Sequence, residues 1–129
     1  MSGSFALDTN IVIAFFREDA AVLAHVKAAD ALFVPAVVLG ELRYGARKSG
    51  QIRANLDRVQ AFEAVVSVLP VNAGTAEHYG IIKDVLRAKG RPLPENDIWI
   101  AAVAAQHGLP VVSRDEHFAE VDGLELVRW

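Results

Sequence analysis

The 129-residue sequence contains no cysteine. Disulfide cross-links, metal sites built on thiolates and cysteine nucleophiles are therefore all excluded. Because a chain without disulfides suits a reducing compartment, we expect a cytoplasmic protein.

Long apolar runs are also missing. The longest apolar stretch, Ala31 to Gly40, is interrupted by Pro35 and is well short of the roughly 20 residues that a membrane helix needs. The first apolar stretch contains Asp8 and follows no basic region, so we expect neither a secretory signal nor a membrane segment.

Charge is sparse and slightly acidic. Charged residues make up 22% of the chain and hydrophobic residues 53%, a balance typical of a folded protein rather than a disordered one. At this length we expect residues 1–129 to form a single domain with one site. The net charge of −3 argues against binding to nucleic acid by bulk positive charge, so any such partner must be held locally.

Short β-branched or aromatic runs alternate with longer helical patterns, which predicts an α/β fold with a central, mostly parallel five-stranded sheet flanked by helices. We expect strands at 5–7, 32–34, 68–71, 111–113 and 124–127, helices at 11–16, 19–29, 36–48, 51–66, 72–89 and 97–106, and a short helical turn at 115–118.

Two acids directly follow predicted parallel strands. Asp8 comes after Phe5-Ala6-Leu7, and Asp115 follows Val111-Val112 by a few residues. Ligands of open α/β sheets bind at this edge, so both acids are candidate site residues. Capping of the next helix is the alternative for each of them.

Two further acids lie in apolar surroundings. The helical neighbours of Glu41 include Val37, Val38 and Tyr44, and Asp97 opens a helix that is apolar on nearly every face. A buried, unpaired carboxylate costs several kcal/mol, so such a group must be protonated, paired or bound to a metal. An exposed glutamate and a plain N-terminal helix acid are the alternatives.

If the fold gathers these four acids, their mutual repulsion requires a cation among them. Oxygen ligands, the absence of cysteine and the absence of a histidine ligand motif favour Mg²⁺, with Mn²⁺ as a substitute. Such an ion activates water and binds phosphate oxygens, which points to hydrolysis of a phosphodiester.

Four motifs in register then carry a family resemblance: Asp8-Thr9-Asn10, Glu41-Leu42-Arg43-Tyr44-Gly45, Asn96-Asp97-Ile98-Trp99-Ile100-Ala101-Ala102 and Ser113-Arg114-Asp115-Glu116-His117-Phe118. Their order and spacing resemble PIN-domain ribonucleases, specifically the VapC toxins of type II toxin–antitoxin systems. The resemblance implies a three-layer PIN-like fold and a Mg²⁺-dependent endoribonuclease that cuts structured RNA, such as tRNA or rRNA. It also implies a homodimer, neutralised by a small cognate antitoxin that binds operator DNA with its other end.

Carried over by motif, the family's acidic tetrad falls on Asp8, Glu41, Asp97 and Asp115, with Asp8 and Asp97 holding the metal most directly. The resemblance gives Asn10 and Ser113 the role of orienting carboxylates or water; the family more often has Thr at the position of Ser113, and Ser keeps the hydroxyl.

Residues near the four acids, and the basic residues and histidines elsewhere, have less specific interpretations. Arg114, beside Asp115, has the best position to touch substrate, and Glu95 is interpreted as an exposed loop residue rather than a fifth ligand. Nine basic residues in 43–58 and 83–91 are candidate RNA contacts, with solvated helix faces as the alternative. Because no histidine has a metal-ligand spacing, we expect surface or packing roles for all four.

Two other functions compete with the ribonuclease. A haloacid-dehalogenase-like phosphatase also uses an Asp after the first strand and Mg²⁺, but it needs a second Asp two residues later, where this chain has Asn10. A non-catalytic PIN-like module that binds RNA or a protein is the other alternative, and the presence of all four acids counts against it.

Overall fold

A parallel sheet forms the centre of the molecule. The computed structural model describes residues 3–129. Its five strands run in the order β3-β2-β1-β4-β5, and every neighbouring pair is parallel. The strands are β1 (Ser4–Leu7), β2 (Ala31–Pro35), β3 (Ser67–Leu69), β4 (Val111–Val112) and β5 (Leu126–Val127). The predicted α/β class and the parallel five-stranded sheet are confirmed.

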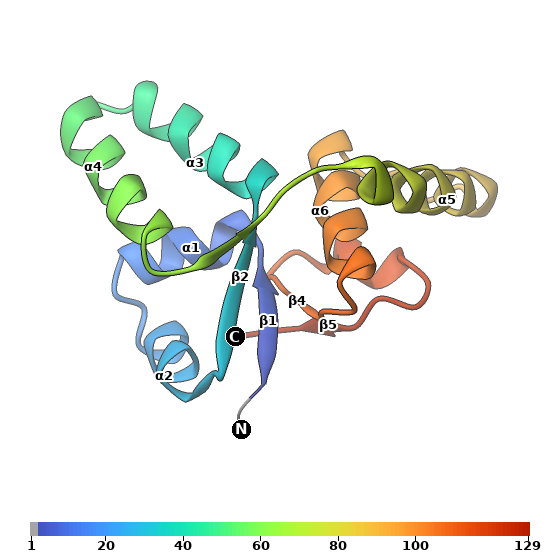
Figure 1. Cartoon of the computed structure of the whole chain (residues 1–129), viewed down its shortest axis with the longest axis horizontal. Helices are drawn as coiled ribbons and strands as arrows, with labels where there is room; N and C mark the ends of the chain where they lie inside the picture. Colours follow the sequence, from blue (N-terminus) through green and yellow to red (C-terminus); the bar gives the residue numbers. More distant parts are fainter. Residues whose placement is uncertain (1–2) are drawn as a thin grey trace.

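Helices flank this sheet, with α1 and α2 to one side and α5 and α6 to the other, so that the sheet is the middle of three layers (Figure 1). The pair α3 and α4 forms a helical hairpin beyond the end of β2 (Figure 1). The helices are α1 (Thr9–Phe16), α2 (Ala20–Ala28), α3 (Ala36–Arg47), α4 (Ile52–Glu63), α5 (Ala73–Lys89), α6 (Glu95–Gln106) and the 3-10 helix η1 (Glu116–Glu120).

The core packs the central strands against α6. Strand β1 buries Phe5, Ala6 and Leu7, as a strand covered on both faces must. Helix α6 buries most of its length, and Ile100 to Ala104 have no exposed surface. The apolar character of this helix therefore predicted its interior position correctly.

Proline accounts for two of the boundaries that differ from expectation, and a glycine marks one that agrees with it. Strand β3 ends at Leu69, before Pro70, which has no N–H to donate to a ladder. Helix α6 begins at Glu95, directly after Pro94, so Asp97 is the third residue of the helix rather than the first. Gly90 ends α5 in the left-handed conformation (φ 68°), as expected.

Strand β5 is shorter than expected because a turn precedes it. The Leu124 N–H donates to the Val121 carbonyl, and the strand starts at Leu126. No helix within residues 3–129 combines the length and the apolar character needed to cross a membrane.

The short helix η1 is fastened to the core by Phe118, whose side chain is fully buried. Replacing Phe118 with Ala should lower the free energy of unfolding by about 3 to 5 kcal/mol, because the large cavity removes packing that the surroundings cannot restore. Urea unfolding followed by circular dichroism measures this change. Val65→Ala, at a position 79% exposed, is the matched control and should change stability by less than about 0.5 kcal/mol. Equal effects of the two substitutions would contradict the anchoring role of Phe118.

Candidate active site

Four acids from distant parts of the chain meet at the carboxyl edge of the sheet. Strands β1 and β4 are neighbours, so the residues that follow them, Asp8 and Asp115, reach the same edge. Helix α3 follows β2 and supplies Glu41, and the first turn of α6 supplies Asp97. The structure thus brings together all four acids that the sequence singled out.

The electrostatics show that these carboxylates affect one another. Burial, together with the negative charges of Asp8, Asp115 and Glu41, raises the pKa of Asp97 to about 6. Burial also raises the pKa of Asp8, against hydrogen bonds from Ser113 and Thr9 that lower it, and the charges of Glu41 and Asp115 add to the increase. Each of these two groups is therefore harder to ionise because the others are present.

Asp8 is both a helix cap and a member of this cluster. Its side chain is 5% exposed. One carboxylate oxygen accepts the Thr9 N–H at 2.8 Å and so caps α1, while the other accepts the Ser113 hydroxyl at 2.7 Å. Capping and site membership, which the sequence presented as alternatives, occur together here.

The Ser113 hydroxyl joins the two loops that carry the site. It donates to Asp8, and it accepts from the Asn10 amide at 3.2 Å and from the Asp115 N–H at 2.9 Å. The Asn10 side-chain oxygen accepts the Arg114 N–H at 3.2 Å. Asn10 and Ser113 thus hold the loop after β1 against the loop after β4.

Glu41 is half-buried and points into the same region. Its Oε1 accepts the Thr9 hydroxyl at 2.6 Å, and its Oε2 lies 3.5 Å from the Asn96 amide nitrogen. Arg43 turns away and pairs with Glu63 at 2.8 Å. Within residues 3–129 no cation pairs with Glu41, so its charge is held by neutral donors alone.

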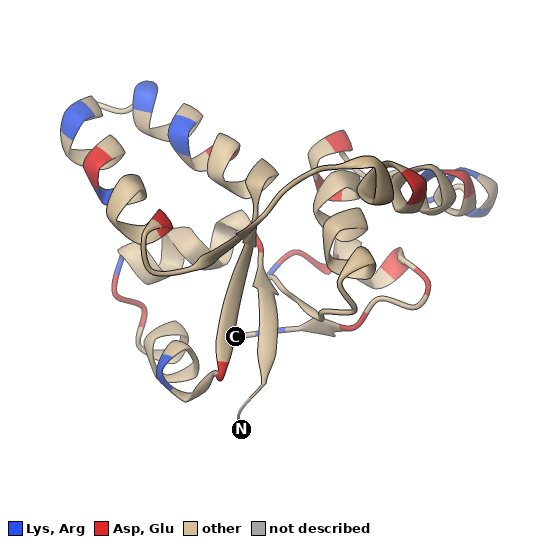
Figure 2. Cartoon of the chain, in the orientation of Figure 1, with Lys and Arg blue, Asp and Glu red and all other residues tan. Residues whose placement is uncertain are grey.

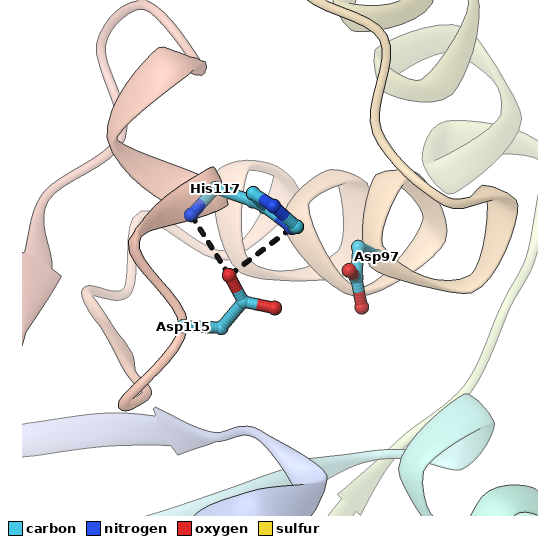
Figure 3. A group of neighbouring side chains, drawn as sticks. All are labelled: Asp97, Asp115 and His117. Atoms are coloured by element: carbon cyan, nitrogen blue, oxygen red, sulfur yellow. Dashed lines mark hydrogen bonds and ion pairs between the residues drawn. The ribbon is translucent and has the colours of Figure 1, made fainter.

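Asp97, Asp115 and His117 form the tightest part of the site (Figure 3). One possible ligand atom from each lies within 4.8 Å of the others. Asp115 Oδ1 accepts the backbone N–H of His117 at 2.9 Å and lies 3.1 Å from its ring nitrogen Nδ1. The carboxylate of Asp97 accepts no hydrogen bond from any residue in 3–129 and faces the other two (Figure 3).

The sequence did not single out His117, for which a surface or packing role was expected. Its side chain is exposed, and its ring also lies within reach of Asp97 and Asp115. Its partner Asp97 lies on another element, so no regular ligand spacing marks the pair. The available signal was its position two residues after Asp115, in the turn that the sequence already predicted.

Two neighbouring residues have other partners. The Arg114 guanidinium donates to Asp19 at 3.0 Å and to the Trp129 carbonyl at 3.0 Å, so its observed contacts are internal and its contact with substrate stays a prediction. Glu95 is exposed as expected, but it belongs to α6 rather than to a loop and contacts Tyr79 and Lys83. The Lys83 ammonium and the Tyr79 hydroxyl lower the pKa of Glu95, and neither contact involves the acid cluster.

A mainly apolar groove begins at Glu41. It has a volume of about 280 Å³ between α1, α3 and α4, and its lining includes the basic residues Arg17 and Arg58.

Basic residues concentrate on the α3–α4 hairpin and at the far end of α5 (Figure 2). Several of these cations, including Arg43, Arg53, Lys83, Lys89 and Arg91, pair with acids, whereas Arg47, Lys48, Arg58 and Arg87 form no ion pair within residues 3–129.

The cluster fits a divalent cation by the chemistry of its donors. It offers carboxylate oxygens that repel one another, and within residues 3–129 no hydrogen-bond donor contacts the Asp97 carboxylate. A cation among these oxygens would remove the repulsion that raises the pKa values of Asp8 and Asp97.

Comparisons with known proteins agree with this fold and site. The PIN domain family model matches residues 5–124. The fold and the acid cluster therefore define a PIN-domain protein. The tRNA(fMet)-specific endonuclease VapC of Shigella flexneri is 34% identical over 128 residues, 97% of each chain.

Solved structures point to the same group. The chain superimposes on the DNA-bound VapBC structure from Salmonella typhimurium with a TM-score of 0.91, at 29% identity and 98% coverage of both chains. It superimposes on VapBC-5 from Mycobacterium tuberculosis, a member of the VapBC family of toxin–antitoxin systems, with a TM-score of 0.79, at 32% identity and 98% coverage of both. Among PIN-domain proteins, this chain belongs to the VapC ribonucleases.

The raised pKa of Asp97 predicts how metal-free protein responds to pH. Folding raises this pKa from 3.8 to about 6, so the native state binds more protons than the unfolded state between these values, and this group makes stability fall as pH rises through that window. Asp97→Asn removes the effect. At pH 7 and without metal, the variant should be more stable than the wild type by about 1 kcal/mol, a value reduced for solvent screening of this half-buried group.

Chemical unfolding of both proteins in EDTA at pH 4 and pH 7 measures this difference. The two should be equally stable at pH 4 and should differ at pH 7. Asp84→Asn, an exposed acid of α5, serves as control and should match the wild type at both values. A variant of Asp97 that is less stable than the wild type at pH 7 would show that this carboxylate supports the fold instead of straining it.

Proposed function

We propose that residues 1–129 form a single PIN domain that acts as a Mg²⁺-dependent endoribonuclease toxin, with Mn²⁺ as a substitute ion. The catalytic residues are Asp8, Glu41, Asp97 and Asp115. The observation that carries the proposal is the convergence of these acids, which is close enough for three of them to raise the pKa of Asp97.

The four acids divide the work at the reacting phosphate. Asp8 and Asp97 hold the cation most directly, and Glu41 and Asp115 complete the ring of oxygens. When bound, the ion activates water for attack on phosphorus and neutralises charge on the phosphate. Asn10 and Ser113 act through Asp8 and the Asp115 backbone, because their hydrogen bonds fix the orientation of both.

Structured RNA is the proposed substrate, and tRNA is favoured over rRNA because a relative of 34% identity is named as a tRNA(fMet)-specific endonuclease. An acidic pocket repels phosphate, so the backbone on either side of the cut needs cations. Arg47, Lys48 and Arg58 on the α3–α4 hairpin supply them, since they form no ion pair within residues 3–129 and are exposed. Arg114 remains a proposed contact through its partly exposed guanidinium.

The proposed partners follow from the VapBC structures that this chain resembles. A small cognate antitoxin of the VapB type fills the groove beside Glu41, where apolar walls suit a peptide and the carboxylate suits a basic side chain. Operator DNA is contacted only through this antitoxin. The toxin is a cytoplasmic homodimer.

The cleavage experiment tests the catalytic assignment. Purified protein should cut a structured RNA in Mg²⁺ or Mn²⁺, and excess EDTA should abolish cutting. Asp97→Asn should reduce the rate at least about a hundredfold, because it removes a charged ligand from the cation. Asp84→Asn should keep the wild-type rate. A folded Asp97→Asn with full activity contradicts the assignment, and binding of RNA without cutting by the wild type would identify a non-catalytic module.

The target is tested in cells. After brief induction, sequencing of newly formed RNA ends should show cuts concentrated at one or a few positions of a tRNA, and co-expression of the cognate antitoxin should prevent them. The same strain carrying the Asp97→Asn variant controls for cuts made by other nucleases. Ends confined to rRNA would move the substrate from tRNA to rRNA, and ends spread evenly over many messages would contradict a structured target.

A further inference from the structure

The proposed function uses four carboxylates and leaves the imidazole of His117 without a role. His117 lies in η1, two residues after Asp115, and its side chain is 61% exposed. Its ring lies beside the carboxylate of Asp115, and Asp97, from α6, lies opposite to both (Figure 3).

The geometry of this group suits joint binding of one ion. Ligands on adjacent corners of an octahedral ion with bonds of about 2.1 Å lie about 3 Å apart. His117 Nδ1 and Asp115 Oδ1 are 3.1 Å apart. One possible ligand atom from each of Asp97, Asp115 and His117 lies within 4.8 Å of the others. The exposed ring has room to rotate by the small amount that closing this set requires.

The backbone of this turn is already fixed. Asp115 Oδ1 accepts the His117 N–H at 2.9 Å, and the next residue, Phe118, is fully buried in the core. The backbone that carries the imidazole is therefore fixed next to the acids, while the exposed ring can turn. The carboxylate of Asp97, on its other side, accepts no hydrogen bond within residues 3–129.

We propose that His117 supplies a ring nitrogen to the divalent cation of the acid cluster, on the side formed by Asp97 and Asp115, and that this nitrogen makes the site bind Mn²⁺ more tightly than Mg²⁺. This inference rests on the proposed function, which places a cation among the acids.

The preference follows from the chemistry of the ligands. Mg²⁺ prefers oxygen and gives up its water reluctantly, so it gains little from an imidazole. First-row transition ions accept imidazole nitrogen, and among them Mn²⁺ also favours octahedral sites rich in carboxylate. A site with several carboxylates and one imidazole therefore matches Mn²⁺ better than a site with carboxylates alone.

The test uses metal-stripped full-length protein and measures binding without any activity assay. Titration calorimetry with Mn²⁺ and with Mg²⁺ gives the two dissociation constants. His117→Gln should raise the Mn²⁺ constant about tenfold or more and change the Mg²⁺ constant less than about threefold. His117→Asn is a second variant of the same kind, and circular dichroism verifies that both are folded.

Pulsed electron paramagnetic resonance of the Mn²⁺-loaded protein shows the nitrogen directly. The wild type should display the ¹⁴N coupling of a directly bonded imidazole, and His117→Gln should lose it. His107→Gln is the matched control, because His107 is exposed at the far end of α6, about 15 Å along the helix from Asp97. This control should keep the coupling and both constants.

The outcomes separate this inference from the proposed function. If Mn²⁺ binds wild type without ¹⁴N coupling and His117→Gln has the same constant, the role of His117 is wrong and the carboxylate site stands. If neither ion binds wild type, or if Asp97→Asn binds both ions as tightly as wild type does, the cation site itself is wrong and both proposals fail.

Discussion

Repulsion among carboxylates at one edge of a parallel sheet is the constraint on which the site depends. The core packing buries Asp8 and half-buries Asp97, and Glu41 and Asp115 add negative charge around them. A carboxylate cluster of this kind opposes folding in the absence of a counter-charge, so it persists only because the apolar interior of β1, β4 and α6 outweighs it. The same repulsion, once a cation is present, becomes affinity for that cation.

Two carboxylates of the acid cluster also cap helices. Asp8 is the N-cap of α1 and Asp115 is the N-cap of η1, so each carboxylate holds one backbone N–H while remaining in the cluster. A carboxylate that accepts one fixed hydrogen bond keeps a defined rotamer and still has lone pairs for another partner. Helix capping therefore orients these groups. The Ser113 hydroxyl connects the two loops, because it donates to the Asp8 carboxylate and accepts the Asp115 N–H.

Local sequence was a good guide to elements and to most of the site. Alternation of apolar runs with helical patterns predicted every strand and helix, and the errors fell at ends, such as those set by Pro70 and Pro94. The four acids were recognisable because each was a charge in apolar surroundings or at a strand end. The proximity of His117 to Asp97 was not predicted, since an exposed histidine in a turn carries no local sign of which residue lies opposite to it.

The order of apolar and polar residues along the chain thus determined the parallel sheet, its buried helix and which acids were out of place, because burial and hydrogen bonding of the backbone act over short stretches. Only the tertiary structure decided that Asp97 meets His117, that Ser113 bridges Asp8 and the Asp115 loop, and that Arg114 turns to Asp19. Those contacts join residues from different elements, and their geometry depends on how whole layers pack against one another, which no local pattern records.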